Sequence, residues 1–185
     1  MMGMGLRIGE TLALKWADLD FNDNNMRICK AAKSTPVIND DGNITGRRME
    51  ISGAKTERSV RTLPKPKVVM NMLEEWKKVY IQRFKASDVD DLAFPNKDGD
   101  LRSYSGFRRQ FERYLEEKGI DKVTFHQFRH AFATMMLERG VNPMVVQEFL
   151  GHKDISTTLG IYTGVTTATM QVAADGADEA IRGIL

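Results

Sequence analysis

The sequence has a single cysteine, Cys29, in 185 residues, so no disulfide can form within the chain. It lacks any apolar run approaching the roughly 18 residues of a membrane-spanning helix, and 28% of its residues are charged. The first residues, MMGMGLRIGE, do not show the charged and then apolar pattern of a secretory signal peptide. These absences argue against an integral membrane protein and against a disulfide-stabilised secreted protein. We therefore expect a cytoplasmic protein with no membrane partner.

A large net charge is also missing, because 27 lysines and arginines stand against 25 aspartates and glutamates. The charges are unevenly placed: positions 47–67 hold seven basic and two acidic residues, whereas positions 86–100 hold five acidic residues and one lysine. A basic surface suits a polyanion such as DNA, although a solvated hairpin has the same pattern. On charge alone, we expect these arginines to contact a DNA backbone: Arg47, Arg48, Arg58, Arg61, Arg102, Arg108 and Arg109.

The spacing of apolar residues predicts an α+β fold that is mostly helical. Helices are expected at 6–16, 66–84, 103–118, 124–139 and 143–150. Thr124 and Asn142 are suited to cap helix starts, and Gly140 and Gly151 are suited to end helices. Strands are expected at 25–32, 48–54 and 59–63, with the last two paired as a hairpin and 36–46 as a connecting loop. Together they would form a small three-stranded antiparallel sheet.

All three histidines of the chain lie between positions 126 and 152, before Tyr162. His126 and Arg129 are three residues apart, so both side chains lie on one face of the expected helix. A guanidinium binds two phosphate oxygens at once, and a helix start adds positive potential. His126 and His130 have the spacing of zinc ligands, but Gln127 stands where metalloproteases have a glutamate, and no cysteine or acidic cluster completes a site. We favour an oxyanion site and expect no metal.

Four separated motifs, in this order, resemble those of the tyrosine recombinases, the family of phage and transposon integrases. They are GLRIGETLALKW, AKTERSVRTLP, HQFRH and LGHKDISTTLGIY. Each motif alone is weak, since Arg7 could pair with Glu10 and Lys55 could be a solvated hairpin lysine. The ordered set covers positions 3–164 and is highly specific. The resemblance implies the following catalytic residues: Arg7, Lys55, His126, Arg129, His152 and Tyr162.

The same resemblance implies the DNA breaking-rejoining fold of the family's catalytic domain. Tyr162 would attack a DNA phosphate to give a covalent 3′-phosphotyrosine, without a metal, ATP or another cofactor. Double-stranded DNA would be the partner, bound by a homo-tetramer whose subunits are monomers when free. We expect positions 1–185 to be one catalytic domain, truncated and without the DNA-clamping domain that precedes it in the family. Positions 165–185 would dock on a neighbouring subunit or fold back on their own domain.

Three alternatives remain open on the sequence. The helices expected at 124–139 and 143–150, joined by a turn, also resemble a helix-turn-helix, as in a DNA-binding regulator without catalysis. A type IB topoisomerase would use the same arginines, lysine and tyrosine to relax supercoils. A remnant recombinase would keep these residues without a competent assembly. Replacing Tyr162 with Phe tests the first alternative, since a regulator does not need the hydroxyl and should keep its DNA affinity and function.

Overall fold

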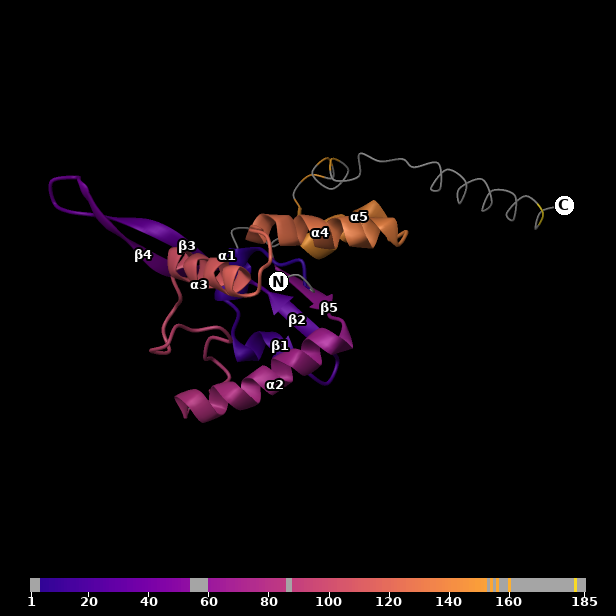
Figure 1. Cartoon of the computed structure of the whole chain (residues 1–185), viewed down its shortest axis with the longest axis horizontal. Coiled ribbons are helices and arrows are strands. Elements are labelled where there is room, and N and C mark those ends of the chain that lie inside the picture. The colour runs from indigo at the N-terminus through magenta and orange to yellow at the C-terminus, as the bar shows by residue number, and fades with distance from the viewer. Residues whose placement is uncertain are drawn as a thin grey trace.

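The structure, a computed structural model, describes residues 4–53, 60–85 and 88–152, and the single positions 154, 156, 160 and 182. The helices are α1 (Ile8–Leu12), the short 3-10 helix η1 (Trp16–Asp18), α2 (Lys67–Phe84), α3 (Tyr104–Glu117), α4 (Phe125–Glu138) and α5 (Pro143–Leu150). The strands are β1 (Leu19–Asp20), β2 (Asn25–Ile28), β3 (Lys30–Ile38), β4 (Ile44–Gly53) and β5 (Arg61–Pro64). Their arrangement confirms the predicted α+β class (Figure 1). In the part of the chain that the structure describes, no helix is long and apolar enough to cross a membrane.

The starts of the longer helices follow from local sequence. The Ser103 hydroxyl accepts a hydrogen bond from a backbone amide in the first turn of α3. At α4, Thr124 Oγ1 accepts from the backbone N–H of Gln127, and Gln127 Oε1 accepts from the backbone N–H of Thr124. Asn142 caps α5 directly before Pro143. The helices predicted from position 66 onward are therefore confirmed, apart from one or two residues at their ends.

The first helix is shorter than predicted, since α1 ends at Leu12. Beyond it, the carbonyl oxygen of Leu14 accepts a hydrogen bond from the backbone N–H of Ala93 at 2.7 Å. The backbone N–H of Trp16 donates to the carbonyl oxygen of Asp91 at 3.1 Å. Residues that continue the helical pattern in the sequence thus bond to a distant segment instead of extending the helix.

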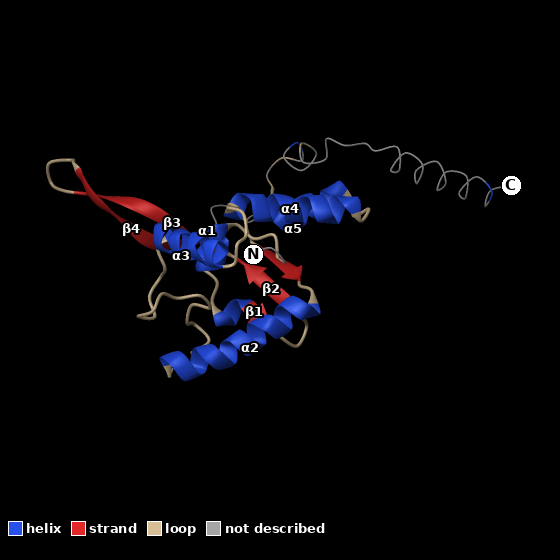
Figure 2. Ribbon diagram, viewed as in Figure 1, coloured by secondary structure: helices blue, strands red, loops and turns tan. Residues whose placement is uncertain are grey.

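The structure corrects the predicted strand pairing. β4 pairs with β3, from Lys30 opposite Gly53 to Ile38 opposite Ile44, and not with β5. The three-stranded antiparallel sheet has the order β1-β2-β5 (Figure 2). Residues 36–46, predicted to be a loop, form the outer part of the β3–β4 hairpin around a turn at 39–43. The β-branched residues on both sides of this turn favour extended backbone, and the Asn and Asp residues are confined to the turn itself.

Two apolar clusters meet at α5. The larger one joins α2 to the three-stranded sheet, with Met70 and Met26 among its buried residues. The smaller one joins α4 to α5, through residues such as Phe132 and Leu150. Phe149 on α5 packs against both clusters. The C-terminal end of α5 is therefore fixed between the two packed parts of the domain.

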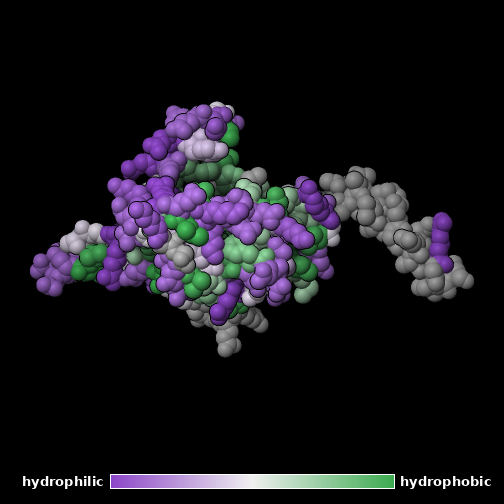
Figure 3. Space-filling model, turned by 90° about the horizontal axis from the view of Figure 1, so that it is seen from below, coloured by the Kyte–Doolittle hydropathy of each residue, from purple (hydrophilic) through white to green (hydrophobic). Residues whose placement is uncertain are grey.

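The β3–β4 hairpin extends away from the body of the domain, at the left of Figure 1. Hydrophilic residues predominate on the face shown in Figure 3, where the projecting arm carries both hydrophilic and hydrophobic groups. Val37, Ile38 and Ile44 are exposed in the outer part of this hairpin. Arg47 and Arg48, two of the predicted DNA contacts, are exposed on the same hairpin.

Candidate active site

The C-terminal end of α5 collects three arginine side chains from separate parts of the chain. The helix ends at Leu150, and Gly151 follows with a φ of 66°, in the left-handed region that favours glycine. Arg7 before α1, Arg61 in β5 and Arg129 in α4 all donate hydrogen bonds to carbonyl oxygens of residues 149–151. Cations are stabilised at this place because the carbonyl end of a helix carries a partial negative charge.

Arg129 is held by main-chain groups on two sides. The residue is only 6% exposed. Nη1 donates a hydrogen bond to the carbonyl oxygen of Gly5 at 2.7 Å, and Nη2 donates to that of Leu150 at 2.6 Å. Burial, and then the charge of Arg7, lowers the pKa of Arg129 to about 10. The guanidinium therefore stays charged at neutral pH and is fixed in place.

Arg7 reaches the same helix end from the residue that precedes α1. Its Nη2 donates to the carbonyl oxygen of Gly151 at 2.7 Å, and its Nη1 pairs with Oε1 of Glu10 at 3.1 Å. The Arg7 side chain is 45% exposed, whereas that of Glu10 is 8% exposed. A guanidinium has five N–H donors, so Arg7 can keep these anchors and still donate to a ligand from solvent.

Arg61 and Glu10 form a buried, two-pronged ion pair. Nη1 and Nη2 of Arg61 each lie 3.1 Å from a different carboxylate oxygen of Glu10, and both side chains are 8% exposed. Burial opposes the charge on Glu10, but the hydrogen bonds and charges of Arg61 and Arg7 outweigh it and hold the pKa of Glu10 below its ordinary value. The guanidinium of Arg61, for which the sequence predicted a contact with a DNA backbone, is thus buried and bound to Glu10.

His152 lies directly after the turn that ends α5, and His126 lies exposed in the first turn of α4. Burial, followed by the charges of Arg129, Arg7 and His126, lowers the pKa of His152 to about 4. Its imidazole is therefore neutral at neutral pH. Four of the residues implied by the family resemblance thus come together at one end of α5.

The other two, Lys55 and Tyr162, lie outside the described residues, as does Arg58 among the expected DNA contacts. Of the described cluster, the sequence analysis assigned no site role to Glu10, although its place three residues after Arg7 is the spacing of a helical pair.

Lys65 is a second buried ionisable residue that the sequence did not single out. It is 5% exposed, and its Nζ donates to the carbonyl oxygen of Met4 at 3.4 Å and lies 4.3 Å from the centre of the Phe149 ring. Burial, together with the charge of Arg61, lowers its pKa to about 7. Nothing in the local sequence distinguishes it from Lys67, which is exposed two positions later.

The remaining expected DNA contacts lie on other elements. On β4, Arg47 Nε donates to the Ser34 hydroxyl, and Arg48 pairs with a glutamate of its own strand. On α3, Arg108 pairs with a glutamate one turn later, and Arg109 is exposed.

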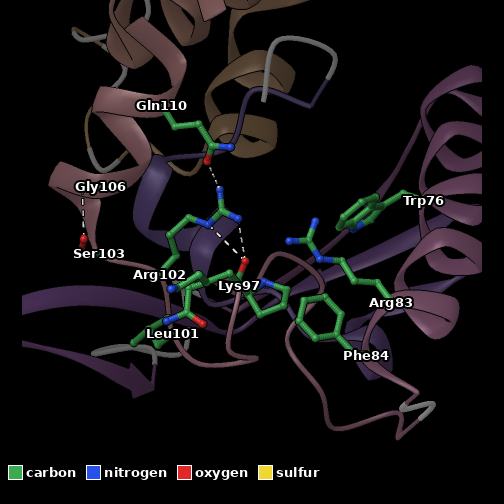
Figure 4. A pocket seen from close by; sticks show the side chains of 11 residues that line it. Trp76, Arg83, Phe84, Lys97, Leu101, Arg102, Ser103, Gly106 and Gln110 are labelled. Atoms are coloured by element: carbon green, nitrogen blue, oxygen red, sulfur yellow. Dashed lines mark hydrogen bonds between the residues drawn. The ribbon is translucent and has the colours of Figure 1, made fainter. Parts of the chain in front are cut away.

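Arg102 lines a cavity of about 410 Å³ between α2 and α3 (Figure 4). Its guanidinium donates two hydrogen bonds to the carbonyl oxygen of Pro95 and one to Gln110. Figure 4 shows the guanidinium of Arg83 directed toward the same cavity from α2. Burial, and then the charge of Arg83, lowers the pKa of Arg102.

The chemistry of the α5 site is that of an anion site built from guanidinium groups. Of the three arginines, Arg7 and Arg61 pair with one carboxylate, that of Glu10, and the neighbouring imidazole of His152 is neutral. A planar guanidinium matches the oxygens of a phosphate, and a partly buried cluster of this kind strengthens the attraction. Within residues 4–53, 60–85 and 88–152 and the four single positions, no three His, Cys, Asp or Glu side chains are grouped so that they could hold a metal ion.

Comparison with known proteins gives one family over most of the chain. The phage integrase family matches residues 1–169. The chain is 35% identical over 170 residues to a "Tyrosine recombinase XerC-like" protein of Caldanaerobacter subterraneus subsp. tengcongensis, covering 88% of this chain and 43% of that protein. It is 33% identical over 178 residues to "Tyrosine recombinase XerA" of Pyrococcus furiosus, covering 96% of this chain and 52% of that protein. The chain thus spans about half the length of the curated relatives it matches.

Solved structures share the fold. The Tn1549 transposon integrase in complex with a circular intermediate DNA superposes with a TM-score of 0.74 at 21% identity, covering 95% of this chain and 56% of that one. XerA recombinase superposes with a TM-score of 0.67 at 22% identity, covering 95% of this chain and 53% of that one. These likenesses confirm the fold that the motifs predicted.

Proposed function

The chain belongs to the phage integrase family, and on that premise we propose that it breaks and rejoins DNA at specific sites through a covalent 3′-phosphotyrosine. One observation carries the proposal: Arg7 and Arg129, far apart in the sequence, donate hydrogen bonds to the same carbonyl oxygen, that of Leu150. This arrangement supports a phosphate clamp, since one guanidinium is rigid and the other is half exposed. His152 stands next to the clamp as a neutral imidazole.

The two arginines hold the non-bridging oxygens of the scissile phosphate, where negative charge develops in the transition state. Loss of one such donor is expected to cost about 3 kcal/mol of transition-state stabilisation. The neutral His152 forms a hydrogen bond with the same phosphate.

Tyr162 supplies the nucleophile. Its phenolic oxygen forms a bond to phosphorus while the bond from phosphorus to the 5′-oxygen breaks. An ordinary phenol has a pKa of about 10, so its proton must be taken up as it attacks, and His126 accepts it. Lys55 gives a proton to the departing 5′-oxygen, because an alkoxide is a poor leaving group. One phosphodiester replaces another, and attack by a second 5′-hydroxyl reverses the step and joins the strands.

Double-stranded DNA is the proposed partner. Four copies of the chain hold it during strand exchange, and the chain is a monomer when it is free of DNA. We assign backbone contacts to Arg47 and Arg48 on β4, to Arg108 and Arg109 on α3, and to Arg58. Positions 165–185 are the candidate contact to a neighbouring subunit. The proposed place of action is the cytoplasm.

A denaturing gel tests the reaction. The chain is incubated with end-labelled, nicked duplexes from the ends of the DNA element that encodes it, alongside Tyr162→Phe and Arg129→Lys variants. The expected result is a protein-DNA band that survives denaturation, disappears in Tyr162→Phe and weakens about 100-fold in Arg129→Lys. Tyr114→Phe, which removes an exposed hydroxyl on α3, is the matched control and should keep the band.

Two results would contradict the proposal. Sequence-specific binding without a covalent band, unchanged in Tyr162→Phe, would favour a DNA-binding regulator or a remnant recombinase. A covalent band accompanied by plasmid relaxation, with no joined products from two sites, would favour a topoisomerase.

A further inference from the structure

Arg61 makes four hydrogen bonds at the point where the candidate active site is held together. Nη1 and Nη2 each donate to Glu10 at 3.1 Å. Nη2 also donates to the carbonyl oxygen of Leu150 at 3.3 Å, and Nε donates to that of Phe149 at 3.4 Å. The side chain is 8% exposed, so these protein groups replace solvent around the guanidinium.

The partners of Arg61 also hold the two arginines proposed to bind phosphate. Glu10 accepts hydrogen bonds from both the backbone and the side chain of Arg7. The carbonyl oxygen of Leu150 accepts from Arg7 at 3.4 Å and from Arg129 at 2.6 Å. A displacement of Arg61 would therefore change the surroundings of both Arg7 and Arg129.

The turn after α5 leaves room for this guanidinium. A Cβ atom on Gly151 would lie 2.9 Å from Nη1 and 3.0 Å from Cζ of Arg61. At 2.9 Å, a Cβ atom would force the Arg61 guanidinium to shift, in addition to the strain of the positive φ of Gly151. Close packing between the turn and Arg61 links the strand β5 to the segment that leads into His152.

We propose that Arg61 is a positioning residue for DNA cleavage, which fixes Glu10 and the end of α5 and thereby sets the orientation of Arg7 and Arg129 toward the scissile phosphate. This inference rests on the proposed function of those two arginines. A lysine cannot replace it, because an ammonium group lacks the planar fork that bonds Glu10 and the helix end together.

The test uses Arg61→Lys, which keeps the charge and removes the fork. With saturating amounts of the nicked duplexes described above, we expect the rate of covalent complex formation to fall on the order of 10- to 100-fold. The Kd for DNA should change by less than about threefold, because Arg61 does not face solvent. Arg113→Lys is the matched control: this arginine is 71% exposed and pairs with Glu117 on α3, and both quantities should stay unchanged.

A double variant tests whether Arg61 acts through Arg7 or contributes to cleavage independently of it. If Arg61 acts through Arg7, the Arg61→Lys and Arg7→Lys double variant should lose much less activity than the product of the two single losses.

A second readout does not depend on cleavage. Because lysine keeps the positive charge, a changed titration midpoint of His152 in Arg61→Lys, followed by NMR, reports a displaced α5 end. We expect the midpoint to rise in Arg61→Lys and to stay constant in Arg113→Lys.

Several outcomes would overturn the inference. A Kd for DNA weakened well beyond threefold in Arg61→Lys would make Arg61 a DNA contact, as its charge first indicated. A lower rate that matches the unfolded fraction measured by circular dichroism would make it purely structural. An unchanged rate of covalent complex formation, together with an unchanged titration midpoint of His152, would show that Arg61 has no positioning role. If the unaltered chain forms no covalent complex, the proposed function fails, and the His152 midpoint alone decides whether Arg61 orders the end of α5.

Discussion

Nη2 of Arg129 lies 2.6 Å from the carbonyl oxygen of Leu150, and the same oxygen accepts longer hydrogen bonds from Arg7 and Arg61. Carbonyl groups at a helix end have no partner within the helix, and three guanidinium groups gather around this one. Only Glu10 neutralises any of their charge within the described cluster. The uncompensated positive charge gives this helix end the attraction for an anion on which the proposed reaction depends.

His152 should titrate far below an ordinary histidine. Its folded pKa of about 4 lies below the ordinary value of 6.5, so the folded chain binds fewer protons than the unfolded chain between these values. The contribution of His152 to stability is therefore fully present above pH 6.5 and is lost as the pH falls toward 4. NMR titration should give a midpoint near 4, and Arg7→Gln should raise it by removing one of the responsible charges. A midpoint near 6.5 in the unaltered chain would contradict the described surroundings.

Lys65→Met should stabilise the fold at neutral pH. The folded pKa of about 7 lies below the ordinary 10.5, so the buried charge carries its full cost below pH 7, and stability rises with pH between 7 and 10.5. The variant should gain at least about 1 kcal/mol in the free energy of unfolding at pH 7. Its stability should also no longer rise with pH between 7 and 10.5. Urea unfolding at several pH values measures both. Lys67→Met, at an exposed neighbouring position, is the control and should change little.

Gly151→Ala should lower the stability of the fold by more than its backbone strain alone would. Gly140 has a φ of 77° and open space where a Cβ would stand, whereas Gly151 has a φ of 66° and a Cβ there would lie 2.9 Å from Arg61. Gly140→Ala should therefore lose about 1 kcal/mol of stability from backbone strain. Gly151→Ala should lose more and should also slow covalent complex formation, since Arg61 must shift. Equal effects of the two variants, in chemical unfolding and in the gel assay, would show that Arg61 moves aside without consequence.

Arg109→Gln should weaken DNA binding through the phosphate backbone. Arg109 is exposed on α3. If it contacts one phosphate, the slope of log Kd against log salt should fall by about 0.9. Fluorescence anisotropy at several salt concentrations gives the slope. Arg113→Gln, on the same helix, serves for comparison, and identical slopes for both variants would exclude a specific contact from Arg109.

The positions of the longer helices could be predicted from the local sequence. Thr124 and Asn142 predicted helix starts that the structure confirms, because a cap satisfies amide groups within three residues of itself. The strand pairing needed more than local rules. β5 pairs with β2, which lies more than 30 residues earlier in the sequence. The strands between them, β3 and β4, pair with each other as a separate hairpin. The local sequence did not distinguish these strands from one another. Met26 of β2 and Leu63 of β5 are buried in one apolar cluster with α2, whereas none of the residues that the structure describes in β3 and β4 belongs to that cluster.

The sequence by itself determined the family, through four ordered motifs, and named the side chains that we propose to hold and attack a phosphate. It also determined the α+β class, because apolar periodicity and caps act over a few residues. Only the tertiary structure decided which of the arginines at the end of α5 are accessible and which are buried. Arg7 and Arg61 are both charged residues in basic or polar sequence, yet one side chain is 45% exposed and the other 8% exposed. That difference arises from contacts across more than 50 residues, at the end of α5 and at Glu10, which no local pattern records.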